Sequence, residues 1–82
     1  MKKIYMMDLW IYDEENVPES IGVAFAESEK DLTEIPRHEL NSEPLIQEVL
    51  EDAGCESIGY VTEISRGEYE EEYMDNHTLI EL

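Results

Sequence analysis

The sequence predicts an α+β domain in which a small antiparallel β-sheet of four or five strands carries one main α-helix on one face, a ββαββ-like arrangement. Apolar residues alternate at period two near the N-terminus and again after residue 57, which indicates strands. Between these stretches, residues 43–53 have the period of an amphipathic helix. With 82 residues, the chain forms one compact acidic domain, 1–82, because a second core could not be built.

The first two strands follow from the N-terminal pattern. Residues 4–12 read IYMMDLWIY, and the odd-numbered positions are all apolar or aromatic, which predicts a strand with one fully apolar face. The segment DEENVPES contains turn residues and predicts a loop. Ile21, Val23 and Phe25 then alternate with smaller residues as a second strand. We expect the two strands to form an antiparallel hairpin.

Two helical segments are expected next. Ser28 followed by Asp31 resembles a helix start and predicts one or two helical turns that stop at Pro36. The main helix is predicted over residues 43–53, where apolar side chains recur on one side. Gly54 should end that helix in the left-handed conformation.

The C-terminal third continues the sheet. Apolar and β-prone residues alternate over 58–64 and predict a third strand. The dipeptide Arg66-Gly67 can form a tight turn after it. The tail TLIEL is short and apolar enough to be the last strand.

Residues 67–75, GEYEEEYMD, allow two interpretations. In a helix, Tyr69 and Tyr73 would lie one turn apart on one stripe. In a strand, Tyr69, Glu71 and Tyr73 would share one face. We favour the strand, because turn residues flank the segment and the alternating tyrosines are β-prone.

Charge is the strongest functional signal in the chain. The net charge is −17, from 22 acidic and 5 basic residues, and such a field repels nucleic acid and anionic membrane. We therefore expect a basic nucleic-acid-binding protein or complex as the partner, with no direct nucleic acid and no membrane. On a strand, alternate carboxylates recur about every 6.6 Å, the same order as the roughly 3.4 Å axial spacing of phosphates along one nucleic-acid strand.

The main helix contributes a second acidic pair. Glu51 and Asp52 would occupy its last turn, where the helix macrodipole disfavours anions. A local rule broken without visible compensation often marks an interaction surface. The residues predicted to bind the partner are Glu68, Glu70, Glu71, Glu72, Asp75, Glu51, Asp52, Tyr69 and Tyr73.

The sequence contains no signature of catalysis, so we expect a protein that is not an enzyme and has no cofactor or metal. It has no G-x-S-x-G motif, no glycine-rich phosphate loop and no EF-hand loop. His38 and His77 are isolated from any zinc-binding spacing. A single cysteine, Cys55, fits a reducing compartment. No apolar stretch reaches the 18 or so residues of a membrane span, and we expect a cytoplasmic protein.

A small, strongly acidic α+β domain without catalytic motifs resembles the phage-encoded inhibitors: anti-CRISPR proteins, anti-restriction proteins and other nucleic-acid mimics. The resemblance covers size and composition over the whole chain and involves no motif. It implies a DNA-mimic mechanism in the host cytoplasm, in which an acidic surface occupies the nucleic-acid-binding groove of an enzyme complex and inhibits it by protein–protein interaction.

Two alternatives remain open. The even face of the first strand carries Ile4, Met6, Trp10 and Tyr12, and this apolar area suggests a homodimerising or adaptor module. The charge can also serve only solubility or salt adaptation. Against salt adaptation, the acids are 17 Glu to 5 Asp and the chain retains 8 Ile, whereas we expect such adaptation to favour Asp and to reduce large aliphatic residues.

Overall fold

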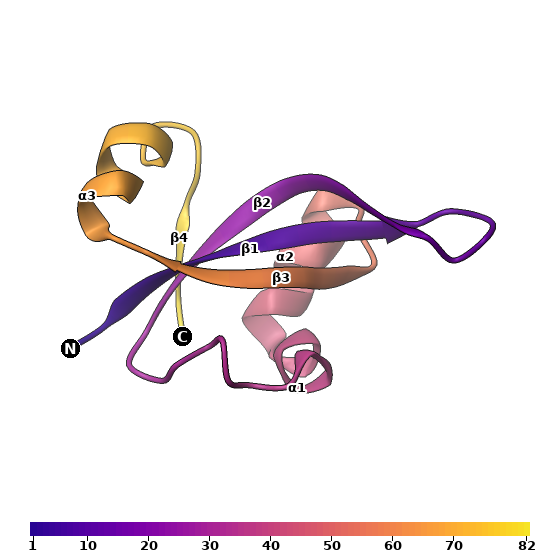
Figure 1. Cartoon of the computed structure of the whole chain (residues 1–82), viewed down its shortest axis with the longest axis horizontal. Helices are drawn as coiled ribbons and strands as arrows, with labels where there is room; N and C mark the ends of the chain where they lie inside the picture. The colour runs from indigo at the N-terminus through magenta and orange to yellow at the C-terminus, as the bar shows by residue number, and fades with distance from the viewer.

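The computed structural model describes all 82 residues and confirms a mixed α+β fold with a four-stranded sheet (Figure 1). The strands are β1 (Lys3–Tyr12), β2 (Pro18–Ser28), β3 (Ser57–Ile64) and β4 (Leu79–Glu81). Their order across the sheet is β3-β1-β2-β4. The helical elements are α1 (Arg37–Ser42), α2 (Pro44–Ala53), α3 (Arg66–Glu68) and the π-helical turn η1 (Tyr69–Tyr73).

The predicted hairpin is confirmed. β1 and β2 pair antiparallel from Lys3 opposite Ser28 to Tyr12 opposite Pro18, and their far ends project beyond the helices as a two-stranded arm (Figure 1). The loop between them is ordered by Asp13, whose Oδ1 accepts hydrogen bonds from the N–H groups of Glu15 and Val17 at 2.8 and 2.9 Å. An aspartate that bonds nearby backbone N–H groups in this way stabilises a tight loop.

The last strand corrects the expected topology. β4 pairs with β2 in parallel, with Phe25, Ala26 and Glu27 opposite Leu79, Ile80 and Glu81. The sheet is therefore mixed, and both the all-antiparallel expectation and the ββαββ-like order are wrong. The physical reason lies in the connection: β3 and β4 occupy opposite edges of the sheet, so α3 and η1 carry the chain across.

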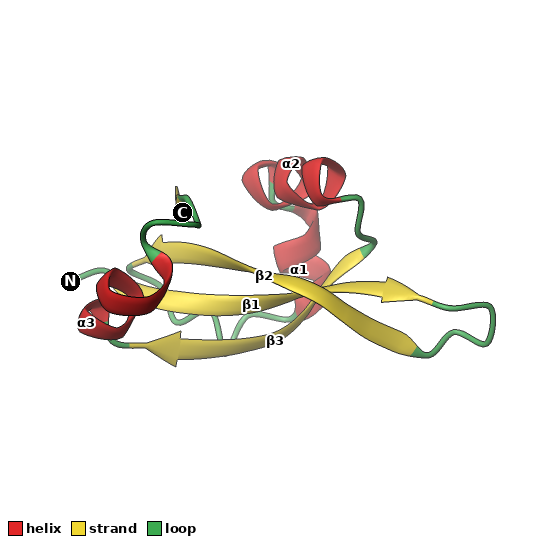
Figure 2. Cartoon of the chain, turned by 90° about the horizontal axis from the view of Figure 1, so that it is seen from above, coloured by secondary structure: helices red, strands yellow, loops and turns green.

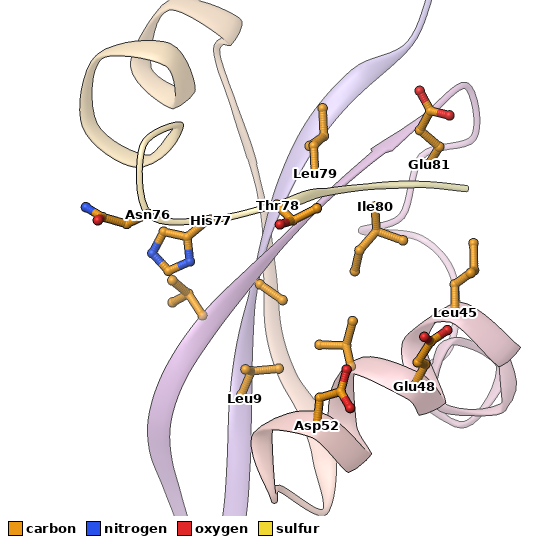
Figure 3. A pocket seen from close by; sticks show the side chains of 13 residues that line it. Leu9, Leu45, Glu48, Asp52, Asn76, His77, Thr78, Leu79, Ile80 and Glu81 are labelled. Atoms are coloured by element: carbon orange, nitrogen blue, oxygen red, sulfur yellow. The ribbon is translucent and has the colours of Figure 1, made fainter.

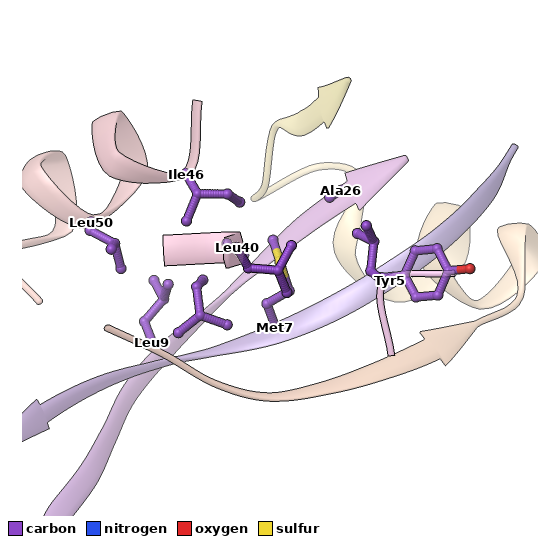
Figure 4. Packing of buried hydrophobic residues seen from close by; sticks show 10 residues of the cluster. Tyr5, Met7, Leu9, Ala26, Leu40, Ile46 and Leu50 are labelled. Carbon is purple, nitrogen blue, oxygen red and sulfur yellow. The ribbon is translucent and has the colours of Figure 1, made fainter. Parts of the chain in front are cut away.

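The helix predicted over residues 43–53 is present and begins within one residue of its predicted start, but the expectation of a single main helix is not confirmed, because the chain also forms α1, α3 and η1. α2 begins at Pro44 and ends before Gly54, which has a φ of 70° and caps the helix in the left-handed conformation. Its buried residues Ile46 and Leu50 pack over the odd-numbered face of β1 (Figure 4). The larger core cluster consists of Tyr5, Met7, Leu9, Ala24, Ala26, Leu32, Leu40, Ile46, Leu50 and Ile58.

The prediction of a short helix before Pro36 is wrong. Residues 29–36 form turns, in which the Oδ1 of Asp31 accepts hydrogen bonds from the N–H and the hydroxyl of Thr33. This local bonding competes with helix formation. A six-residue helix, α1, begins directly after Pro36, so the proline starts a helix where we expected it to stop one.

The acidic segment is helical, and our preference for a strand is wrong. Ser65 caps α3 by accepting a hydrogen bond from the N–H of Glu68 at 3.1 Å. A strand would place Glu71 between Tyr69 and Tyr73 on the packed face. The helical turn brings both tyrosines to the sheet and leaves Glu71 exposed, which avoids burying a charge.

Candidate partner-binding surface

The helical segment after β3 presents five exposed carboxylates. They belong to Glu68, Glu70, Glu71, Glu72 and Asp75, and we call them the α3–η1 acidic surface. None of them forms an ion pair, because the molecule has only two: Lys3 with Glu63, and Arg66 with Glu27. Arg66, which pairs with Glu27, is the one cation of this segment and also attracts Glu70. The surface therefore keeps a concentrated excess of negative charge.

An aromatic cluster holds this surface against the sheet. Phe25 is fully buried, and its ring centroid lies 5.2 Å from that of Tyr69, 4.6 Å from that of Tyr73 and 5.0 Å from that of His77. The hydroxyl of Tyr69 donates to the backbone carbonyl of His77 at 3.0 Å. Because the segment is anchored in three places, its carboxylates are presented from a firmly packed support.

Tyr69 and Tyr73, which we predicted to contact the partner, pack inside the molecule instead. Tyr69 is only 5% exposed and Tyr73 is half-buried, so they offer little aromatic area to a partner. They anchor the segment, together with Phe25 and the half-buried His77, which we did not expect to take part. The four-residue spacing of positions 69, 73 and 77 is the signal that could have revealed it.

A second signal for this helix was also present in the sequence. Ser65 and Glu68 form the pattern Ser-x-x-Glu, which is typical of a helix N-terminus. Arg66, inside this pattern, pairs with Glu27 of β2 and ties the start of α3 to the sheet. That hydrogen bond from the Arg66 guanidinium to Glu27 raises the pKa of Arg66.

The structure does not bring all predicted acids together. Glu51 and Asp52 are exposed in the last turn of α2, as expected. However, α2 packs on the face of β1 that carries Met7 and Leu9, whereas Tyr69 packs on the opposite face with Ile4. α2 and α3 also lie over different ends of the sheet (Figure 2). The acidic residues therefore form at least two separate surfaces.

An open groove of about 730 Å³ lies between α2 and β4, and we call it the α2–β4 groove (Figure 3). Its apolar lining comes from seven residues: Leu9, Val23, Ala24, Leu45, Val49, Leu79 and Ile80. Its acidic lining residues are Glu48, Asp52 and Glu81, and no Lys or Arg lines it. The combination of an apolar lining with negative charge distinguishes it from the purely acidic α3–η1 surface.

The apolar face proposed for dimerisation is smaller than the sequence suggested. Of the four residues Ile4, Met6, Trp10 and Tyr12, Ile4 is 2% exposed, and Met6 is partly buried against the same cluster. These two offer little area to a partner. The ring of Trp10 packs against that of Tyr60, with centroids 5.3 Å apart. The guanidinium carbon of Arg37 lies 5.6 Å from the centroid of the Trp10 ring. Only Tyr12, at 40%, is exposed among the four.

No cluster of metal-ligating side chains accompanies these surfaces. The structure contains no group of three or more His, Cys, Asp or Glu side chains arranged to hold a metal ion.

Hydrogen bonds from Thr33 lower the pKa of Asp31, and burial raises the pKa of Tyr5. Because the pKa of Asp31 is lowered, its contribution to stability is present at neutral pH and is lost as the pH falls through the folded-state pKa.

Cys55 is expected to react with iodoacetamide several-fold more slowly in the folded protein than in urea. Burial raises the pKa of this thiol, and its Sγ donates to the carbonyl of Leu50 at 3.7 Å. Because the thiolate is the nucleophile, a raised pKa reduces the reactive fraction. Mass spectrometry of timed samples at one pH measures both rates. Equal rates in the folded and unfolded chain would show that folding does not protect the Cys55 thiol.

The longest helix, α2, has ten residues, and no helix of the structure is long and apolar enough to cross a membrane. The chain matches no protein family, no curated protein and no solved structure.

Proposed function

We propose that this protein is a non-enzymatic inhibitor that occupies the basic groove of a nucleic-acid-binding enzyme complex, as anti-CRISPR and anti-restriction proteins do. The observation that carries the proposal is the α3–η1 acidic surface, five exposed carboxylates that form no ion pair, on a segment anchored by packed aromatic rings. The partner is a basic protein of the cytoplasm, and its Lys and Arg side chains neutralise this surface.

The charge balance supports a cationic partner. Of 22 acidic side chains, only Glu27 and Glu63 are in ion pairs, so most of the negative charge is uncompensated. Such a field accelerates association with a positively charged groove and repels nucleic acid from the same place. An exposed pair contributes at most about 1 kcal/mol, so useful affinity requires several contacts, which a cluster of carboxylates provides.

The helical shape of this segment also suits mimicry of a nucleic-acid backbone. In the π-helical turn η1, backbone hydrogen bonds join residues five apart, so side chains four or five residues apart lie on one face and recur on the order of every 5 Å along the axis. Glu68 with Glu72, and Glu71 with Asp75, follow this spacing. It is of the same order as the phosphate spacing of a nucleic-acid strand, about 3.4 Å in axial rise. Because the segment is already packed, little conformational entropy is lost on binding.

Changing Glu70, Glu71 and Glu72 together to Gln is expected to weaken partner binding roughly tenfold in low salt, because three exposed charge contacts are lost. The partner is first isolated from cell lysate on the immobilised protein and eluted by steps of salt. Its Kd for each variant is then measured against salt concentration, and its binding to duplex DNA is measured in competition. The triple variant should show a smaller salt dependence and weaker competition.

The matched control changes Glu14, Glu15 and Glu19 to Gln. These residues are exposed at the far end of the hairpin and alter the net charge by the same amount. The control should bind almost as the unmodified protein does. Equal affinity of the first triple variant and the unmodified protein would rule out the α3–η1 acidic surface. Equal loss in both variants would show that only net charge matters.

A further inference from the structure

The α2–β4 groove lies beside an unpaired sheet edge. β4 pairs only with Phe25, Ala26 and Glu27, so residues 18–24 of β2 have β1 on one side and no strand on the other. Val23, from this free stretch, lines the groove. A strand edge with free N–H and C=O groups can pair with an extended segment of another chain.

The chemistry of the groove selects what such a segment would carry. Its lining offers an apolar surface from Leu9, Ala24 and Val49. Glu48 and Asp52 project from α2 beside it, and none of the lining residues is Lys or Arg (Figure 3). An apolar side chain would fill the lining, and long cationic side chains would reach the two carboxylates.

We propose that the α2–β4 groove binds an extended segment of a partner protein in which apolar residues alternate with Lys or Arg, and that this segment pairs with the free edge of β2. Strand pairing supplies backbone hydrogen bonds, and the groove selects the side chains. A second copy of this chain does not fit, because residues 18–24 include Glu19 and no cation, and two copies with a charge of −17 repel each other.

This site is separate from the α3–η1 acidic surface. None of residues 68–75 lines the groove, and α2 packs on the opposite face of the sheet from Tyr69. The inference therefore goes beyond the proposed function, and each can fail without the other. Full binding of the groove peptide by the Glu70, Glu71, Glu72 triple variant is the result that shows this independence.

The test uses an N-acetylated, C-amidated peptide of five alternating arginine and valine residues, titrated into the isotopically labelled full chain. Amide chemical shifts are expected to change at residues 19–24 and in α2 near Glu48 and Asp52, and not at 68–75. The same peptide methylated on its backbone nitrogens, and an equally charged peptide with glycine in place of valine, should each bind at least several-fold more weakly. The first loses strand pairing and the second loses the apolar contact.

The matched variants are Glu48→Gln with Asp52→Asn, and Glu14→Gln with Glu15→Gln as the control of equal charge. The groove variant should raise the Kd of the arginine–valine peptide roughly tenfold, since two charge contacts are lost, whereas the control should leave it nearly unchanged. Equal binding of the glycine or the methylated peptide overturns the proposal, as do shifts confined to 68–75. Shifts of residues 19–24 that depend on protein concentration without peptide would assign the edge to a second copy and overturn it too.

Discussion

Replacing Phe25 by alanine is expected to lower the free energy of unfolding by about 3–5 kcal/mol. The ring is fully buried, and it packs against the rings of Tyr69, Tyr73 and His77. Its removal takes away both the hydrophobic burial and the aromatic contacts that hold α3 and η1. Because the total stability of a domain is only about 5–15 kcal/mol, a large fraction of the variant should be unfolded or lack this helical segment.

Urea denaturation followed by circular dichroism measures the loss, and amide hydrogen exchange locates it. Exchange should accelerate first in residues 69–74, since their packing depends most directly on Phe25. Val17→Ala is the control, because Val17 is 52% exposed in the hairpin loop and its truncation should change stability by less than about 0.5 kcal/mol. A Phe25→Ala protein as stable as this control would show that the aromatic cluster does not support the segment.

Replacing Gly59 by alanine is the second change with a large expected effect. A Cβ at this position would overlap the indole ring of Trp10, which lies directly over the glycine. A glycine within a strand often marks such a close approach. The ring would have to move, and overpacking of this kind costs about 1–3 kcal/mol. Trp10 would also lose its contacts with Tyr60 and Arg37.

Trp10 is the only tryptophan, so its fluorescence reports this displacement directly. We expect a red shift of the emission maximum together with a lower urea midpoint. Gly67→Ala is the matched control, because a Cβ there meets nothing within 4 Å and alanine favours a helix more than glycine does. An unchanged emission maximum and midpoint in Gly59→Ala would contradict the close packing of the ring over β3.

The sequence was sufficient to predict the elements whose formation depends on residues close together in the chain. Period-two alternation identified the β1–β2 hairpin, because a one-residue shift would move its apolar side chains to the wrong face. Helical spacing and Gly54 identified α2, since both act within a few turns of chain. Local bonding at Asp31, however, prevented a helix where the Ser28 and Asp31 pattern suggested one.

The conformation of residues 66–73 and the direction of β4 needed long-range information. Both a helix and a strand place Tyr69 and Tyr73 on one side, so the local pattern was ambiguous. Contact with Ile4 and Phe25, distant in the chain, favours the helix, because only the helix keeps Glu71 away from the core. The same packing brings the tail to β2 in the parallel direction.

The charge of −17, the hairpin and the helix at residues 44–53 were already specified by composition and by residues close together in the chain. Long-range packing, in contrast, separates the acids of α2 from those of α3 and η1 and makes Tyr69 an anchor. It also created the α2–β4 groove from four separate segments: β1, β2, α2 and residues 76–81. The physical reason is that proximity in space is set by which apolar side chains share a core, and a linear pattern does not specify those partners.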